Sequence, residues 1–265
     1  MSQTVLVTGA SSGIGQATAQ LLAQQGYTVF GTARKPAAAM SNGVTMVALD
    51  VRSDDSVRAC VDRVLTQAGG IDVLVNNAGY SLMGAAEETS VTEAKAQLET
   101  NFFGVVRMVN AVLPAMRKAH KGKVINIGSL AGITAIPFGA FYTASKFAIE
   151  GYTEALWHEL RPLGINVSVI EPGFVHTKIG EGTQIAAVSL GAYDSVRKRA
   201  TAALTRHVAA GISPDAVATT VLRAIKSRSP SLRYRVGADA VWLPRVKQVA
   251  PWSVFAAGVR KTFDV

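Results

Sequence analysis

The sequence lacks most of the features that mark secreted, membrane-spanning or metal-binding proteins. Among its 265 residues Cys60 is the one cysteine, so no disulfide can form within the chain, as is typical of a reducing compartment. No uncharged apolar run is long enough to span a bilayer, and no basic, cleavable leader precedes the first strand-like segment. The four histidines do not have the spacing of metal ligands. We therefore expect a cytoplasmic protein without a metal site.

Charge is also scarce, and it is unevenly placed. Charged residues make up 17% of the chain and hydrophobic residues 49%, which is the composition of a folded globular protein. The net charge is +9, and residues 221–265 alone hold nine Lys and Arg against two acids. Such an excess can attract nucleic acid or an anionic membrane surface, although a solvated face is the commoner explanation. Because no aromatic-rich basic groove accompanies it, we expect no nucleic-acid partner and leave membrane-surface contact open.

Strand-like and helix-like segments alternate along the chain. Continuous apolar or β-branched runs predict strands at 4–8, 28–32, 44–49, 71–75, 124–127, 165–170 and 233–236. Alternation of this kind is typical of a doubly wound, Rossmann-type parallel sheet with helices on both faces. Since no linker or repeat interrupts the pattern, we expect one α/β domain of seven strands over residues 1–265.

A glycine-rich turn, Thr8–Gly15, follows the first predicted strand and precedes a helical pattern. Glycine permits a tight turn and a close approach of backbone to ligand, and a helix N-terminus offers free N–H groups to a phosphate. This strand-turn-helix arrangement predicts dinucleotide binding. Ligands of such sheets bind at the carboxyl ends of the strands, where Asp50, Asn76, Ser129 and Pro172 also fall.

Tyr142 and Lys146 are four residues apart and would lie on one face of a helix. A free phenol titrates near ~10, and a neighbouring ammonium lowers that pKa toward the physiological range. The pair could therefore exchange a proton with a substrate, and Ser129 could hold the substrate oxygen in front of the phenol. Because Tyr-x-x-x-Lys pairs also arise by chance on helix surfaces, this prediction depends on the rest of the chain.

The end of the second predicted strand distinguishes NADP(H) from NAD(H). An acid there would bind a free ribose diol and repel a 2′-phosphate. This chain has Ala33 at that position, followed by Arg34 and Lys35, which offer a planar fork and a second cation. Ser11 and Ser12 can add hydroxyl groups from the glycine-rich turn. We predict a preference for NADP(H), with a solvated surface role for Arg34 and Lys35 as the alternative.

Three further stretches of the chain carry predictions about the surface. Residues 92–119 are predicted to be helical, and the apolar stretch 102–113 would be buried on two sides, which favours a homodimer or homotetramer. Residues 178–212 hold glycine and alanine without clear strands, and are either a mobile substrate loop or an ordinary insertion. Residues 238–265 form a C-terminal extension whose apolar face would dock on the domain, cover a lipophilic pocket or touch a membrane.

Taken together, the motifs occur in the order of a known family. They are Thr8-Gly9-x-x-x-Gly13-x-Gly15, Asn76-Asn77-Ala78-Gly79, Asn101, Ser129, Tyr142-x-x-x-Lys146, and Pro172-Gly173 with Thr177. With these residues the sequence resembles the short-chain dehydrogenase/reductase family over roughly residues 3–177, and most closely its steroid and retinol dehydrogenase branch.

The resemblance implies a role for each motif residue. Tyr142 would be the general acid in reduction and the base in oxidation, with its pKa lowered by Lys146, which would also bind the nicotinamide ribose. Ser129 would orient the substrate oxygen, and Asn101 would kink its helix and hold a water for proton relay. The residues expected at the cofactor are Gly9, Ser11, Ser12, Gly13, Ile14, Gly15, Arg34, Lys35, Asp50, Val51, Asn77, Ala78, Gly79, Tyr142, Lys146, Pro172, Gly173, Val175 and Thr177.

These observations predict an NADP(H)-dependent oxidoreductase that transfers a hydride between nicotinamide and a ketone or aldehyde or the corresponding alcohol. The residues expected around the substrate lie in loops after the predicted strands: Tyr80, Leu82, Met83, Ile133, Phe138, Phe174 and His176. They are mainly apolar, which predicts a lipophilic substrate, although several could simply be core residues. A sensor that binds dinucleotide without turnover is the alternative, and the complete catalytic set argues against it.

Overall fold

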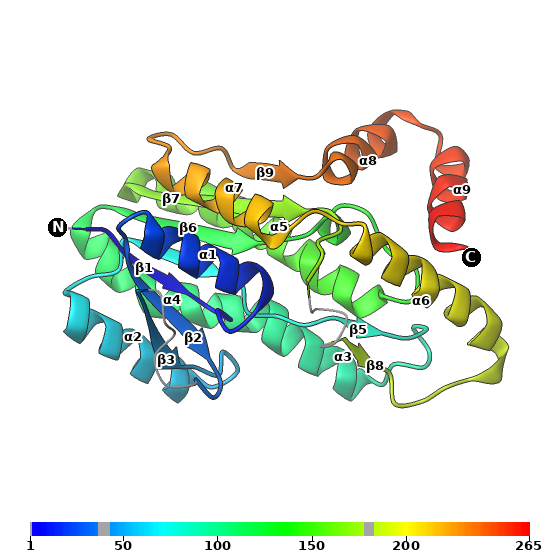
Figure 1. Cartoon of the computed structure of the whole chain (residues 1–265), viewed down its shortest axis with the longest axis horizontal. Coiled ribbons are helices and arrows are strands. Elements are labelled where there is room, and N and C mark those ends of the chain that lie inside the picture. Colours follow the sequence, from blue (N-terminus) through cyan, green and yellow to red (C-terminus); the bar gives the residue numbers. More distant parts are fainter. Residues whose placement is uncertain (1, 37–42, 178–182) are drawn as a thin grey trace.

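The computed structural model describes residues 2–36, 43–177 and 183–265 of the chain. Its central feature is a seven-stranded sheet in the order β3-β2-β1-β4-β6-β7-β9, with every neighbouring pair parallel. The order changes direction between β1 and β4, which is where doubly wound sheets bind their ligands. The predicted Rossmann-type fold is confirmed (Figure 1).

The strands of the sheet are short and mostly buried. Their bounds are β1 Thr4–Val7, β2 Thr28–Ala33, β3 Val44–Ala48, β4 Val73–Asn76, β6 Gly122–Ile127, β7 Ile165–Pro172 and β9 Arg233–Val236. All residues of β1 and β4 are buried, as the continuous apolar runs predict for strands covered on both faces. A separate pair, β5 (Leu82–Met83) and β8 (Gln184–Ile185), lies beyond the sheet.

Helices cover both faces of the sheet and bury two apolar cores against it (Figure 1). The helices on one face are α2 (Asp54–Ala68), α4 (Gly104–Ala119) and α5 (Ala140–Leu160), and those on the other are α1 (Gly13–Gln24) and α7 (Pro214–Lys226). Capping side chains mark where several of them begin: Ser53 accepts a hydrogen bond from the Ser56 N–H at the start of α2, and Ser213 precedes Pro214 at the start of α7.

The helix predicted over residues 92–119 is interrupted. It consists of α3 (Val91–Leu98), a π-helical turn η1 (Glu99–Phe103) and α4. The sheet buries one side of this stretch, and the outward side of the turn leaves Phe103 45% exposed. Burial of that second side by another subunit stays a prediction.

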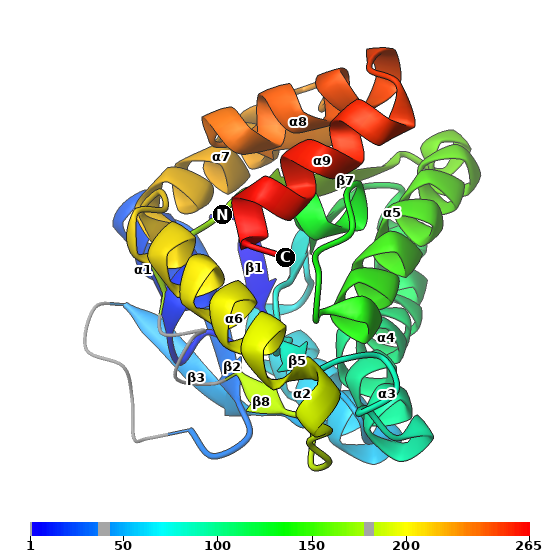
Figure 2. The same cartoon turned by 90° about the vertical axis from the view of Figure 1, so that its right-hand side faces the viewer.

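Residues 178–212 were predicted to be either a mobile substrate loop or an ordinary insertion. Residues 178–182 lie outside the described residues, and the remainder contains a helix that was not predicted. Residues 194–209 form α6 (Asp194–Ala209), which reaches across the carboxyl ends of the strands (Figure 2). Its fully buried residues are the small Ala200 and Ala203. Because the helix buries alanine, the period of large apolar residues that marks an amphipathic helix is missing.

The C-terminal extension folds into α8 (Ala238–Val249) and α9 (Trp252–Phe263). The expected apolar face of α9 is only partly buried: Phe255 and Phe263 dock inward, whereas Trp252 is 71% exposed. The end of α9 lies against α6, where Arg206 pairs with Asp264 at 2.6 Å. In the part of the chain that the structure describes, we find no helix with the length and apolar character needed to cross a bilayer.

Candidate active site

The glycine-rich turn has the backbone that its sequence requires. Gly9 and Gly13 adopt positive φ angles of 67° and 54°, a region that favours glycine. A Cβ on Gly15 would lie 2.3 Å from the Gly9 carbonyl oxygen, so a larger residue there would force the turn open. Ser12 begins α1 and its side chain does not cap the helix. The turn is therefore a narrow backbone cradle with a helix N-terminus behind it, which fits a dinucleotide pyrophosphate.

The loop after β4 is tied to this turn by Thr8. The Thr8 hydroxyl accepts hydrogen bonds from the N–H groups of Asn77 at 2.9 Å and Ala78 at 3.0 Å. The Asn77 amide donates in return to the carbonyl oxygens of Thr8 at 2.9 Å and Gly9 at 3.0 Å. A Cβ on Gly9 would approach the Ala78 Cα to 2.9 Å. The sequence analysis assigned Thr8 to the motif but did not predict that its hydroxyl joins the end of β1 to the loop after β4.

The ends of β2 and β3 meet beside the turn, where the Leu49 N–H donates to the Ala33 carbonyl oxygen at 2.9 Å. Arg34 and Lys35 follow Ala33 and are exposed, so their cations are accessible to an anion bound there. Asp50 pairs with Arg52 at 2.6 Å, and this hydrogen-bonded ion pair lowers the pKa of Asp50 to about 2. Arg52 was not among the predicted site residues.

All four predicted catalytic residues, Asn101 included, line one cavity. Ser129 follows β6, and Tyr142 and Lys146 lie on α5. The Lys146 Nζ lies 5.8 Å from the centre of the Tyr142 ring and donates a hydrogen bond to the Ile127 carbonyl oxygen at 2.8 Å. The Ser129 Oγ accepts from the Ala131 N–H at 3.0 Å, which fixes the hydroxyl at the strand end.

Asn101 lies in the π-helical turn and is 2% exposed. Its Oδ1 accepts from the Tyr80 N–H at 3.1 Å, and its Nδ2 donates to the Tyr80 carbonyl oxygen at 3.0 Å and the Ser145 Oγ at 3.1 Å. A π-helical turn adds a residue to the helix, which turns this amide inward. The side chain thus joins the loop after β4 to α5. Its expected role in a water relay stays a prediction.

The pKa values of the Tyr-Lys pair move in directions set mainly by burial. Burial raises the pKa of Tyr142, and its hydrogen bond with Ser129 opposes that rise. Burial lowers the pKa of Lys146 to about 8, while the negative charge of Glu150 acts the other way. The sequence analysis predicted a lowered phenol pKa from the neighbouring ammonium alone. The structure instead raises the pKa of Tyr142 by desolvation, so the phenol holds its proton at neutral pH.

Two carboxyl groups lie behind the wall that carries Lys146. Glu150 and Glu171 are 8% and 0% exposed, and burial together with the charge of Glu171 raises the pKa of Glu150 to about 8. Arg233 Nε donates to Glu150 at 3.2 Å, and Arg235 Nε donates to Glu171 at 3.0 Å. These pairs attach the edge strand β9 to α5 and β7.

No cluster of His, Cys, Asp and Glu suited to a metal ion occurs among the described residues.

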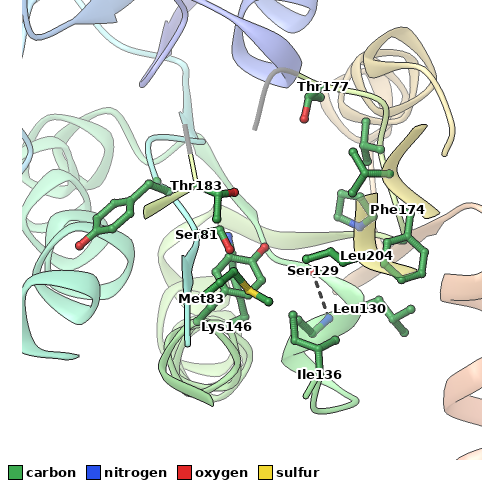
Figure 3. A pocket seen from close by; sticks show the side chains of 18 of the residues that line it. Ser81, Met83, Ser129, Leu130, Ile136, Lys146, Phe174, Thr177, Thr183 and Leu204 are labelled. Atoms are coloured by element: carbon green, nitrogen blue, oxygen red, sulfur yellow. Dashed lines mark hydrogen bonds between the residues drawn. The ribbon is translucent and has the colours of Figure 1, made fainter. Parts of the chain in front are cut away.

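The cavity has a volume of about 400 Å³ and is bounded by two different walls. The sheet side contributes the strand-end loops and α5, and the opposite side is formed by α6. Figure 3 shows Met83, Ser129 and Leu204 arranged around the same space. The α6 residues that line it are Thr201, Leu204, Thr205 and Val208. None of these four was predicted, because α6 itself was not.

The predicted substrate residues are divided by the structure. Tyr80, Met83 and Phe174 line the cavity. The described lining residues do not include the other four, Leu82, Ile133, Phe138 and His176. Leu82 is buried beside Met83 in β5, and His176 is exposed. Ser81, Ile136, Thr183 and Ile185 line the cavity and were not predicted.

The stretch predicted to flank nicotinamide connects the cavity to the glycine-rich turn. Pro172, Gly173, Val175 and Thr177 all line the cavity, and so does Ile14 at the start of α1. Asp239 holds this stretch: it accepts from the Phe174 N–H at 2.8 Å, and a Cβ on Gly173 would clash with its carboxylate at 2.0 Å. Val51, also predicted at the cofactor, is buried after β3, and a Cβ on Gly104 would lie 2.7 Å from its side chain.

Comparison with known proteins identifies this architecture. A family model described as short chain dehydrogenase matches residues 3–186. The chain is 40% identical over 237 residues to 3-ketodihydrosphingosine reductase of Bacteroides thetaiotaomicron, covering 89% of this chain and 88% of that protein. It is 37% identical over 273 residues to retinol dehydrogenase 8 of Bos taurus, covering 94% and 86%.

Solved structures agree with the sequence relatives. A short-chain dehydrogenase from Streptomyces avermitilis superposes with a TM-score of 0.82 at 33% identity, covering 97% of this chain and 98% of that one. A relative from Burkholderia phymatum in complex with NAD has a TM-score of 0.82 at 26% identity, covering 93% of each chain. A serine dehydrogenase complexed with NADP+ has a TM-score of 0.73 at 28% identity, covering 88% of this chain and 94% of that one. Fold, cradle and family match together show that this chain is an oxidoreductase of the short-chain dehydrogenase/reductase family with a nicotinamide dinucleotide as its cofactor.

Proposed function

We propose that the protein is an NADP(H)-dependent reductase or dehydrogenase that interconverts a lipophilic ketone or aldehyde and its alcohol. One observation carries this proposal. Ser129, Tyr142 and Lys146 lie together on the wall of a mainly apolar cavity that reaches the glycine-rich turn. A cavity that joins a proton donor to a dinucleotide cradle suits hydride transfer to a carbonyl carbon.

In reduction, Tyr142 acts as the general acid. Its raised pKa keeps the phenol protonated at neutral pH, so it can donate a proton to the carbonyl oxygen as negative charge develops there. The Ser129 hydroxyl donates a hydrogen bond to the same oxygen, and the Lys146 ammonium stabilises the phenolate left on Tyr142. Oxidation of an alcohol uses the same groups in reverse. Bound nicotinamide supplies or accepts the hydride.

The residues present fit the cofactor along its whole length. Gly9, Gly13 and Gly15 leave room for the pyrophosphate, and the predicted nicotinamide stretch 172–177 continues into the cavity. At the adenosine end, exposed Arg34 stands where an acid would select NAD(H). We infer a preference for NADP(H), because the guanidinium of Arg34 matches phosphate oxygens. Ala33 also carries no carboxylate that would repel the 2′-phosphate.

The lipophilic substrate class rests on the cavity lining and on two relatives. Apolar side chains predominate around the cavity, among them Met83, Leu130, Ile136, Phe174 and Leu204. The names of two relatives, 3-ketodihydrosphingosine reductase and retinol dehydrogenase 8, refer to compounds with long apolar portions. Both observations support a substrate that buries hydrocarbon in the cavity and presents one carbonyl or hydroxyl group to Tyr142.

We further propose a single catalytic domain that works in the cytoplasm as a homodimer or homotetramer. The outward side of η1 and α4 presents Phe103 at 45% exposure beside half-buried Phe102, and their rings contact each other at 5.0 Å. Burial of this aromatic pair by a second copy would remove it from water. The lone buried Cys60 suits a reducing compartment.

A screen of ketones and aldehydes with long apolar chains, following the loss of NADPH absorbance, tests the proposal. Turnover of such compounds, with little turnover of short polar ketones, is the expected result. Dinucleotide binding without turnover of any carbonyl or alcohol would favour the sensor alternative instead. Repeating the screen with NADH separates the cofactor preference from the reaction class.

A further inference from the structure

The α8–α9 surface has an unusual density of exposed apolar side chains. Trp242, Val246, Val249, Trp252 and Val254 are 60%, 45%, 84%, 71% and 61% exposed. Half of the large hydrophobic residues that are exposed in the described chain therefore fall within thirteen consecutive positions. Single exposed apolar residues are normal on a protein surface, but a contiguous group marks an interaction site.

The two helices hold this group outward as one surface. Trp242, Val246 and Val249 lie at helical spacing on one side of α8, and Trp252 begins α9 directly after a short turn. The opposite side of α8 is anchored through Ala240, which is fully buried. We call the five residues 242, 246, 249, 252 and 254 the α8–α9 apolar surface.

The exposed charges of α8 and α9 that have no ion-pair partner in the described chain are all positive. Arg245, Arg260 and Lys261 are exposed, and the described part of the chain gives none of them an ion-pair partner. Both acids of this region already have partners: Asp239 accepts from main-chain N–H groups, and the exposed Asp264 pairs with Arg206. The guanidinium of Arg245 lies 5.1 Å from the Trp242 ring centre, which places a cation beside the aromatic surface.

We infer that the α8–α9 apolar surface docks on an anionic lipid bilayer. Trp and Val side chains would enter the interfacial region of the bilayer, and the three exposed cations would contact lipid phosphates. A second copy of the chain is disfavoured, since a symmetric contact would bring the like charges of both copies together. Nucleic acid would use the cations but leave the exposed Val and Trp residues in water.

Docking at this surface would bring the cavity close to the membrane. The ring of Phe263 in α9 lies 6.3 Å from that of Phe174, which lines the cavity. Figure 2 shows α9 beside α6 at the end of the molecule where the strands finish. A lipophilic compound could then pass from the bilayer to the cavity without crossing bulk water. Only this delivery step rests on the proposed function, because docking itself is independent of turnover.

Co-sedimentation with vesicles tests the inference directly. One set consists of phosphatidylcholine alone and the other of phosphatidylcholine mixed with phosphatidylglycerol. The wild-type chain is expected to bind the anionic vesicles at low salt, with a blue shift of tryptophan emission, and to bind the neutral vesicles at least about tenfold more weakly. Rising salt should weaken the binding.

Two double variants and a matched control make the test specific. Trp242→Glu/Trp252→Glu should lose binding by at least about tenfold, and Arg260→Gln/Lys261→Gln should lose roughly tenfold on the anionic vesicles only. Arg117→Gln/Lys118→Gln removes the same charge from exposed positions at the end of α4 and should bind as the wild type does. Circular dichroism of each variant confirms that it is folded.

Three results would overturn the inference. The first is absence of wild-type binding to anionic vesicles at low salt. The second is unchanged binding by a folded Trp242→Glu/Trp252→Glu variant. The third is a wild-type oligomer that this variant converts to a smaller species while vesicle binding is absent, which would assign the surface to a second copy of the chain. Turnover plays no part in these measurements, so they fail or succeed separately from the proposed reaction.

Discussion

The two walls of the cavity are held in different ways. The sheet wall carries Ser129 and the Tyr142 helix on a fully buried apolar core, in which Ile125 of β6 and Ile149 of α5 are 2% and 1% exposed. The α6 wall has small buried residues and depends on polar anchors instead. Close packing fixes a side chain within narrow limits, whereas a few hydrogen bonds can open locally. The proposed proton donor therefore lies on the rigid wall, and the four lining residues of α6 lie on the more easily displaced one.

Glu88 is the main anchor of the α6 wall. It is 1% exposed, and its carboxylate accepts from the N–H groups of Ala85 at 2.9 Å and Leu190 at 2.8 Å and from the Arg197 guanidinium. Its hydrogen bonds to these backbone N–H groups and to Arg197 lower the pKa of Glu88 to about 2. One buried acid thus connects the segment before α3 to the segment that leads into α6.

The largest expected effect is a loss of activity on substitution of Tyr142, which lies on the rigid wall. Tyr142→Phe removes the proton donor while the ring still packs, so kcat should fall at least ~100-fold. The dissociation constant of NADPH, measured by fluorescence titration, should change little. A Phe variant that retains the wild-type kcat would contradict the assignment of Tyr142 as the general acid.

The second largest effect concerns the preference between NADPH and NADH. The wild type should show a kcat/KM at least ~10-fold higher with NADPH than with NADH, the size of one charged hydrogen bond. Ala33→Asp/Arg34→Gln should reverse this order, since a carboxylate binds the ribose diol and repels phosphate. Arg58→Gln, an exposed substitution in α2, serves as the control for loss of one positive charge. Equal efficiency of both cofactors in the wild type would show that Arg34 is a solvated surface residue.

Glu88→Gln should loosen the α6 wall without touching the chemistry. Loss of the charged hydrogen bonds is expected to raise KM roughly tenfold for a lipophilic substrate and to leave kcat within about twofold. Amide hydrogen exchange over residues 186–209 should speed up, and exchange in β6 should not. Asp62→Asn, which removes one negative charge from an exposed position in α2, is the control. Equal changes in kcat and in both exchange regions would mean that the two walls are a single unit.

Lowering the pH should loosen the α6 wall of the wild-type protein, as the Glu88→Gln substitution does. The pKa of Glu88 in the folded protein, about 2, lies below its ordinary value of 4.5. The unfolded or detached state therefore binds a proton more readily, and the anchor stabilises the wall above pH 4.5 and fails as the pH falls toward 2. Hydrogen exchange at acid pH should show the α6 segment opening in the wild type and no such pH step in Glu88→Gln.

The smallest effect concerns Lys146. Because its pKa is lowered to about 8, the ammonium that stabilises the Tyr142 phenolate is lost as pH rises through that value. The kcat/KM for reduction, which reports on the free enzyme, should fall roughly fourfold between pH 7 and 8.5. Lys146→Arg should abolish this fall at whatever activity it retains, since a guanidinium keeps its charge. A flat wild-type profile over this range would contradict a role for the Lys146 charge.

Features that depend on neighbours along the chain could be predicted from the amino-acid sequence. Positive φ angles at Gly9 and Gly13, the helical spacing of Tyr142 and Lys146, and the apolar runs of the strands are all local properties. They were sufficient to predict the Rossmann-type sheet and to place the motif residues at its carboxyl edge. The parallel sheet then brings residues far apart in sequence to one edge, because its strands all end on the same side.

The α6 wall and the pKa shifts of buried groups depend on contacts between distant parts of the chain, so the sequence did not predict them. The buried residues of α6 are Ala200 and Ala203, which have no large apolar period, and Thr201 and Thr205 resemble surface residues until a cavity is placed beside them. Glu88 is a charged residue that a sequence places in water, yet it is almost fully buried. The direction of the Tyr142 pKa likewise depends on how much protein surrounds the phenol. Burial is a sum over contacts from the whole fold, and no local pattern contains it.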